Sequence, residues 1–270
     1  MIKFFRKIRQ KLLSEGKNVK YFKYAIGEII LVVIGILIAL QVNNWNQNRL
    51  EENLEDEYYK RLLDDAREEK LILEATLNYS KQVTKHAKDA IAVFENLSNV
   101  NPNPIKNLID IYQASQLLDP YSASSTYKEL IASGQINLIK NDSLKIALIR
   151  YYDLDWSESG VANLENTYRK NLRGKMPSAI QDKIRLACGD IYVKTGNSYL
   201  SSLPKECEIT LDYNLAKSVV EELRKDESLK NDLRYLIGNE SGKLNDLTVT
   251  ILQLEELIKL LEKINNDKIL

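Results

Sequence analysis

The chain has 270 residues, of which 44% are hydrophobic and 28% are charged, so it is long and apolar enough to bury a sizeable core. Its 38 cationic side chains balance its 38 anionic ones, which gives no reason to expect nucleic acid as a partner. One histidine and two cysteines, without a Cys-x-x-Cys pair, argue against a zinc site.

The first 23 residues are strongly basic. They carry eight cations and one anion, Glu15. Residues 2–13 read IKFFRKIRQKLL, in which apolar residues and cations alternate at roughly helical spacing. This pattern is typical of an amphipathic helix on an anionic membrane surface. The simpler alternative is that the charges only orient the chain, without lipid specificity.

A long apolar segment follows. Residues 24–45 read YAIGEIILVVIGILIALQVNNW, and at about 1.5 Å per residue the part from 25 to 42 forms roughly 27 Å of helix, close to the thickness of a hydrocarbon core. Trp45 lies at its end, where an aromatic ring favours the boundary between water and lipid. Because no signal-peptide cleavage site follows, we predict one retained transmembrane helix over residues 24–45.

The charges beside this segment predict its orientation. Lys and Arg favour the cytoplasmic side, so residues 1–23 are expected in the cytoplasm and residues 46–270 in the periplasm. The outer part is mildly acidic, with 30 cations and 36 anions. Its two cysteines, Cys188 and Cys207, are predicted to form a disulfide in this oxidising compartment. The alternative is two unpaired cysteines in a reducing space, which would also contradict the orientation.

The outer part reads mainly as helices. No helix breaker appears between Trp45 and Pro102, so the transmembrane helix is predicted to continue as a stalk to about Leu97. A turn cluster, SNVNPNP, then precedes a second helix over residues 105–118.

Two further helices are predicted to form a tight hairpin. The first covers residues 125–134 and stops at Gly134, a residue suited to a left-handed conformation. The second is capped by Asn141 or Asp142 and is predicted to run to about residue 173.

Residues 187–212 depart from the helical pattern. IYVKT, at residues 191–195, and ECEITL, at residues 206–211, have the β-branched density of strands. We predict a small β-hairpin near residues 190–212, with a disulfide-tied loop as the alternative.

The final predicted helix covers residues 244–264. Its apolar residues recur at spacings of 4, 3, 4 and 3, which suits coiled-coil-like packing against the stalk helix. These residues are Leu247, Ile251, Leu254, Ile258 and Leu261. The predicted fold class is therefore mainly α, with a transmembrane helix that continues into an irregular helical bundle.

Three residues of the apolar segment are candidates for more than anchoring. Glu28 is a carboxylate inside an apolar helix, which is either a functional group or a contact between neighbouring copies. Gly35 and Ala39 form a small-xxx-small pair that allows two helices to approach closely, so self-association is a hypothesis.

Signals for catalysis are sparse. His86, the only histidine, lies in a polar stretch and is expected to be exposed to solvent. The adjacent acids Asp64 and Asp65, and Glu68 and Glu69, are expected to form a solvated surface. The chain contains no phosphate-binding loop, GxSxG, HExxH or dinucleotide fingerprint. We therefore expect no enzymatic activity, no cofactor and no metal.

Two stretches resemble an uncharacterised family of bacterial single-pass membrane proteins. They are MIKFFRKIRQKLLSE with YAIGEIILVVIGILIALQVNNWN, and STYKELIASGQINLIKNDSLKIALIRYY. Together they cover roughly a quarter of the chain. The resemblance implies an inner-membrane protein with a helical outer domain, and it implies no activity or catalytic residues.

These features favour a membrane-anchored, non-enzymatic protein that oligomerises and acts as an anchor or sensor. Its outer domain would bind a small ligand or an unidentified membrane or periplasmic protein, while its apolar helix lies in the lipid bilayer. The alternative is an accessory subunit of an envelope transport or secretion complex, with Glu28 in a shared membrane interface.

Overall fold

The structure is a computed structural model that describes residues 7, 18–98 and 100–267. The chain forms two compact units, residues 1–57 and residues 58–270, which are described separately below. Apart from Lys7, the predicted amphipathic segment of residues 2–13 lies outside the described residues.

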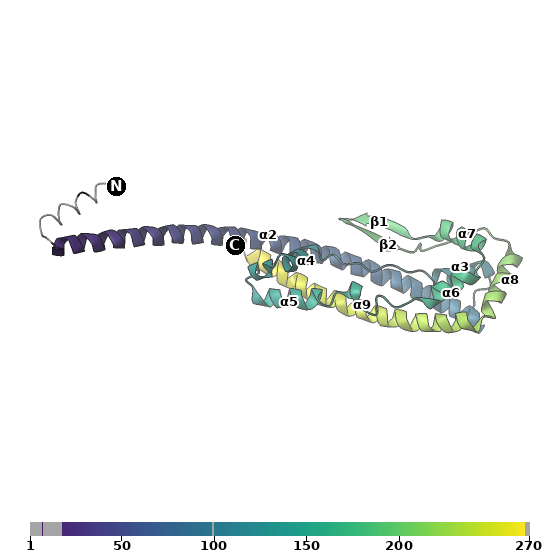
Figure 1. Cartoon of the computed structure of the whole chain (residues 1–270). Helices are drawn as coiled ribbons and strands as arrows, with labels where there is room; N and C mark the ends of the chain where they lie inside the picture. Colours follow the sequence, from purple (N-terminus) through teal and green to yellow (C-terminus); the bar gives the residue numbers. More distant parts are fainter. Residues whose placement is uncertain (1–6, 8–17, 99, 268–270) are drawn as a thin grey trace. The chain divides into compact units, whose positions relative to one another are not determined.

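In the first unit the apolar segment is helical. It belongs to α2 (Asn18–Glu95), drawn from purple to blue in Figure 1. Every side chain from Ile29 to Leu40 is exposed, so apolar residues cover all faces of the helix instead of one buried stripe. The segment is long and apolar enough to be a membrane span or a signal sequence.

The second unit is built on two long antiparallel helices. The part of α2 from Tyr58 onward lies beside α9 (Glu227–Asp267), the yellow-green helix of Figure 1. Ion pairs connect the two helices, and residue numbers rise on α9 as they fall on α2. These pairs are Glu95 with Arg234, Lys70 with Glu255, and Arg67 with Glu262. The predicted packing of the last helix against the stalk helix is thus confirmed.

The apolar seam of α9 explains this packing. Leu247, Ile251, Leu254 and Leu261 are buried, as their spacing predicts. Ile258 is only half-buried, and its neighbour Leu257 is buried. The helix is also longer than predicted, because it passes through Gly238 and Gly242 without a break. Each glycine costs roughly 1 kcal/mol in a helix interior, and the buried leucines on both sides outweigh that cost.

The main core lies at the Glu95 end of this pair. Four helices pack there around residues 87–94 of α2 and residues 229–236 of α9. They are α3 (Pro104–Gln113), α6 (Thr167–Lys175), α7 (Ser178–Cys188) and α8 (Tyr213–Arg224). Tyr168 is fully buried in this core, and its hydroxyl donates to the carbonyl oxygen of Ile111 at 2.9 Å.

The opposite end, near Tyr58, carries the predicted helical hairpin. It consists of α4 (Ser125–Ala132), η1 (Gln135–Leu138) and α5 (Asp142–Tyr152). Gly134 joins the first two with a φ of 70°, as predicted, and the side chain of Asn141 caps α5 by accepting from the backbone N–H of Leu144 at 2.9 Å. Helix α4 is capped by a side chain of α2, because Asp65 accepts a hydrogen bond from the backbone N–H of Thr126 at 2.7 Å.

A two-stranded antiparallel hairpin completes the unit. Strand β1 (Ile191–Thr195) pairs with β2 (Ser198–Ser202), and Gly196 turns the chain with a φ of 60°. The first strand is the predicted IYVKT. The second is SYLSS, so the prediction of a strand over residues 206–211 is wrong. That segment packs three of its side chains, Cys207, Ile209 and Leu211, against the core instead of pairing with a strand.

Two other predicted elements differ from the structure, and one helix was not predicted. The helix predicted over residues 105–118 ends at Gln113. The helix predicted to reach residue 173 stops at Tyr152, and the short turn η2 (Trp156–Glu158) and a loop precede α6. Asp155 favours that break, because its side chain accepts from the backbone N–H of Ser157 at 2.9 Å. Helix α7 was not predicted at all.

Candidate functional site

The predicted site residues fall in two groups. Glu28, Gly35, Ala39 and Trp45 all lie on α2 in the first unit, and the cysteines lie in the second. Gly35 and Ala39 are four residues apart and share one face of the helix. A Cβ atom built on Gly35 would meet no atom within 4 Å, so this face is open for another helix. Self-association through it stays a prediction.

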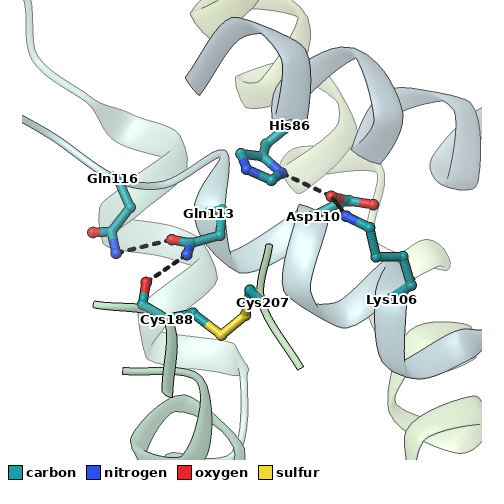
Figure 2. The surroundings of a disulfide bond; sticks show 7 residues. All are labelled: His86, Lys106, Asp110, Gln113, Gln116, Cys188 and Cys207. Carbon is teal, nitrogen blue, oxygen red and sulfur yellow. Dashed lines mark hydrogen bonds and ion pairs between the residues drawn. A yellow bond between two sulfur atoms is a disulfide. The ribbon is translucent and has the colours of Figure 1, made fainter. Parts of the chain in front are cut away.

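The cysteines are joined by a disulfide. Cys188 is the last residue of α7 and Cys207 lies in the segment after β2, with their Cα atoms 5.4 Å apart. Gln113 of α3 fixes the α7 side of the bridge, because its Nε2 donates to the carbonyl oxygen of Cys188 at 2.7 Å (Figure 2). Gln116 in turn donates to Oε1 of Gln113 at 3.0 Å. The disulfide therefore holds the segment around Cys207 close to α3.

His86 is not a free surface histidine. Its Nδ1 lies 2.7 Å from Oδ1 of Asp110, and its side chain is only 16% exposed, so the prediction of an exposed histidine is wrong. The same Asp110 oxygen lies 2.5 Å from Nζ of Lys106, and Figure 2 shows the imidazole and the ammonium group meeting at this carboxylate. Asp110 itself is 4% exposed, so its charge is compensated inside the protein.

Part of this cluster can be recognised from residue spacing in the sequence. Lys106 and Asp110 are four residues apart, the spacing of a helical ion pair. His86 lies on α2 next to Ala87, which belongs to the buried stripe of that helix. A polar residue beside a buried stripe meets the polar face of a neighbouring helix, which here is α3.

A polar groove opens beside this cluster. It has a volume of about 540 Å³, which is within the usual range for small-ligand sites. We call it the disulfide groove, because Cys207 and its neighbours form one of its walls. Its described lining residues are His86, Asn101, Asn103, Ile105, Lys106, Ile109, Gln113, Pro204, Lys205, Glu206, Cys207, Glu208 and Ile209.

The two walls of the disulfide groove differ in charge. The wall from α2, α3 and the loop between them presents the imidazole of His86, the ammonium of Lys106 and two asparagine amides. The wall formed by residues 204–209 presents the carboxylates of Glu206 and Glu208, together with Lys205. The groove thus offers partners for both a negative and a positive group of a ligand.

A second cluster lies at the other end of the unit, around Glu69 of α2. The sequence predicts a solvated surface here, and Asp64 is exposed, but Glu69 is only 2% exposed, so the prediction is wrong for Glu69. Its carboxylate accepts a hydrogen bond from the backbone N–H of Ala123. Burial, together with the nearby charge of Asp155, raises the pKa of Glu69 to about 7, although hydrogen bonds from Ala123, Ser122 and Tyr151 act in the opposite direction.

This second cluster also contains unsatisfied polar atoms. Among the described residues, the hydroxyl of Tyr152 and Nε1 of Trp156 are buried and have no hydrogen-bond partner. Such atoms are rare in folded proteins and cost free energy. The hydrogen bond between Tyr151 of α5 and Glu69 connects α5 to α2 in this cluster.

The part of the chain that is described contains no evident metal-binding site. No three His, Cys, Asp or Glu side chains gather there in a way that could hold a metal ion. The described lining residues of the disulfide groove include no free thiol and no hydroxyl side chain.

Comparisons with known proteins give one match. A family model described as "Family of unknown function (DUF6090)" matches residues 28–184. The matched region contains the α2 and α3 wall of the disulfide groove and ends before the wall formed by residues 204–209. No curated protein and no solved structure matches the chain.

Proposed function

The chain belongs to a family of unknown function (DUF6090), and we propose that it is a membrane-anchored, non-enzymatic binding protein of a bacterial inner membrane. Its helical domain would lie in the periplasm and bind a small polar ligand or a partner in the disulfide groove. It would act as a sensor or an anchor, and oligomerisation through the apolar helix would accompany this role.

The exposure of the apolar helix is the observation that supports membrane anchoring. Twelve successive apolar side chains, residues 29–40, are exposed on every face of α2, an arrangement that water disfavours and lipid accepts. Apolar burial is worth roughly 25 cal/mol for each Å², so leaving these side chains in water would cost several kcal/mol. The basic residues before the helix support a cytoplasmic amino terminus.

Two features support the binding role. The disulfide between Cys188 and Cys207 suits an oxidising compartment, which agrees with a periplasmic domain. It also holds one wall of a polar groove that has the size of a ligand site.

Purification from native membranes tests this role against the alternative of an accessory subunit. The full chain is extracted in mild detergent through a carboxyl-terminal tag, and the stoichiometry of every co-purifying protein is measured. We expect the chain in the membrane fraction, either alone or associated with itself. A second protein recovered at equal stoichiometry, and lost in a Glu28→Gln variant but kept in an Ile26→Leu control, would favour the accessory subunit and contradict the proposal.

A further inference from the structure

The charges of the disulfide groove specify the kind of ligand that it accepts. One wall carries His86 and Lys106, whose partner Asp110 uses only part of their hydrogen-bonding capacity. Asp110 contacts Nδ1 of the imidazole, and the Nε2 of a neutral imidazole with its proton on Nδ1 is an acceptor, so the anionic group of a ligand is bound by Lys106. Lys106 keeps two of its three ammonium hydrogens after its bond to Asp110, and its side chain is 40% exposed. This wall is therefore prepared to bind an anionic oxygen.

The opposite wall has the complementary charge. In the segment after β2, alternate residues pack on the core, namely Cys207, Ile209 and Leu211. Both Glu206 and Glu208 are exposed, and both line the disulfide groove. Each carboxylate accepts hydrogen bonds and is suited to an ammonium group.

Ligands with a single charge fit this groove less well. A simple anion would lie close to Glu206 and Glu208, and a simple cation would lie close to Lys106 and Lys205. A molecule with both charges meets a favourable partner on each side. The apolar side chains of Ile105, Ile109, Pro204 and Ile209 also line the groove and can contact an aliphatic part of the ligand.

We propose that the disulfide groove binds a small zwitterion, namely a free amino acid or a dipeptide. The carboxylate of the ligand lies toward Lys106, and its ammonium group lies toward Glu206 and Glu208. This inference rests on the proposed binding role and adds the chemical class of the ligand to it.

Calorimetric titration of the full chain in detergent tests the ligand class. The probes are the twenty L-amino acids and a set of glycyl dipeptides, each added separately. For every probe that binds, its N-acetyl derivative and its carboxamide derivative are titrated as single-charge controls. We expect each derivative to bind at least about tenfold more weakly, since it loses one charged partner. Binding of no zwitterion, or equal binding of the derivatives, would overturn the inference.

Substitutions locate the site. Glu206→Gln together with Glu208→Gln should weaken binding at least about tenfold and leave the fold intact, because both side chains are exposed. Lys106→Gln should weaken binding similarly. If this variant unfolds because Asp110 loses its partner, the double variant of Glu206 and Glu208 still tests the site. Glu221→Gln, at an exposed position of α8, is the matched control and should have no effect.

Failure of the ligand class differs from failure of the binding role. If only single-charge compounds bind, and the groove substitutions weaken them, the zwitterion is wrong and the binding role stands. If zwitterions bind equally well to the groove variants, the site is wrong. If nothing in a library of polar metabolites shows binding that these substitutions weaken, the ligand-binding role itself fails.

Discussion

The carboxylate of Asp110 lies 2.7 Å from Nδ1 of His86 and joins α3 to α2 behind one wall of the disulfide groove. Because the same oxygen is also bonded to Lys106, one buried carboxylate positions both the imidazole and the ammonium group of that wall. A buried carboxylate with two partners has a structural effect that can be measured separately from ligand binding.

Asp110→Asn should lower the free energy of unfolding by about 3 kcal/mol, because it removes the buried negative charge that Lys106 and His86 contact. Chemical denaturation of the detergent-solubilised chain measures this. Asp89→Asn, at an exposed position of α2, is the control and should change the free energy of unfolding by less than about 0.5 kcal/mol. Equal effects of the two substitutions would show that the cluster does not stabilise the fold.

Glu69 should make stability depend on pH. Its pKa in the folded chain is raised to about 7 from an ordinary value of 4.5, so the folded state binds this proton more tightly than the unfolded state. The contribution of Glu69 to the free energy of unfolding is fully present below about pH 4.5. It is lost as the pH rises to about 7, and the total loss is about 3 kcal/mol. Glu69→Gln should remove this pH dependence. The measurement is the free energy of unfolding of the variant and of the wild type between pH 4 and 8. If Glu69→Gln and the exposed control Glu221→Gln showed the same dependence of unfolding free energy on pH, Glu69 would not be the group responsible.

The disulfide should stabilise the Glu95 end of the second unit. Replacing Cys188 and Cys207 together by serine should lower the free energy of unfolding by about 3 kcal/mol, the cost expected for a loop of this length. A reducing agent should destabilise the wild type similarly and leave the double variant unchanged. A wild-type chain isolated from membranes with two free thiols would contradict both the disulfide and the proposed compartment.

The seam of α9 should be sensitive to truncation. Leu254→Ala removes a fully buried side chain and should cost about 2–5 kcal/mol in unfolding experiments. Leu252→Ala, two residues earlier and 57% exposed, is the matched control and should cost less than about 0.5 kcal/mol. Similar losses at both positions would show that α9 does not pack on α2 through this face.

Self-association of the apolar helix should depend on Gly35. Gly35→Leu places a large side chain on the face shared with Ala39 and should reduce the signal of a membrane dimerisation reporter several-fold. Val33→Leu, a substitution of similar hydrophobicity in the same helix, should leave the signal unchanged. An undiminished signal from Gly35→Leu would exclude this face as the contact.

Much of the fold can be predicted from local patterns. The seam residues of α9, the left-handed Gly134 and the capping Asn141 are readable because helical spacing, backbone freedom and side-chain caps are local properties. The strand IYVKT is readable for the same reason. The passage of α9 through Gly238 and Gly242 is not, since it depends on packing against α2, and propensity alone favours an interruption there.

The candidate site was largely missed for a related reason. Glu69 and His86 lie in polar stretches of one long helix, and the sequence does not show which other elements cover them. Glu69 is buried because the chain near Ala123 lies over it, and His86 because α3 supplies Asp110. The disulfide was predictable only because the expected compartment implied it, and its position beside a groove depends on tertiary structure.

The central claim is an anchored chain with its folded domain outside the cytoplasm. Protease added to intact spheroplasts tests it most directly, with detection through an amino-terminal tag. We predict that residues 58–270 are digested and that a small tagged fragment containing the apolar helix stays with the membrane. Full protection of the chain until the membrane is lysed, or recovery of the intact domain in the soluble fraction, would contradict the account.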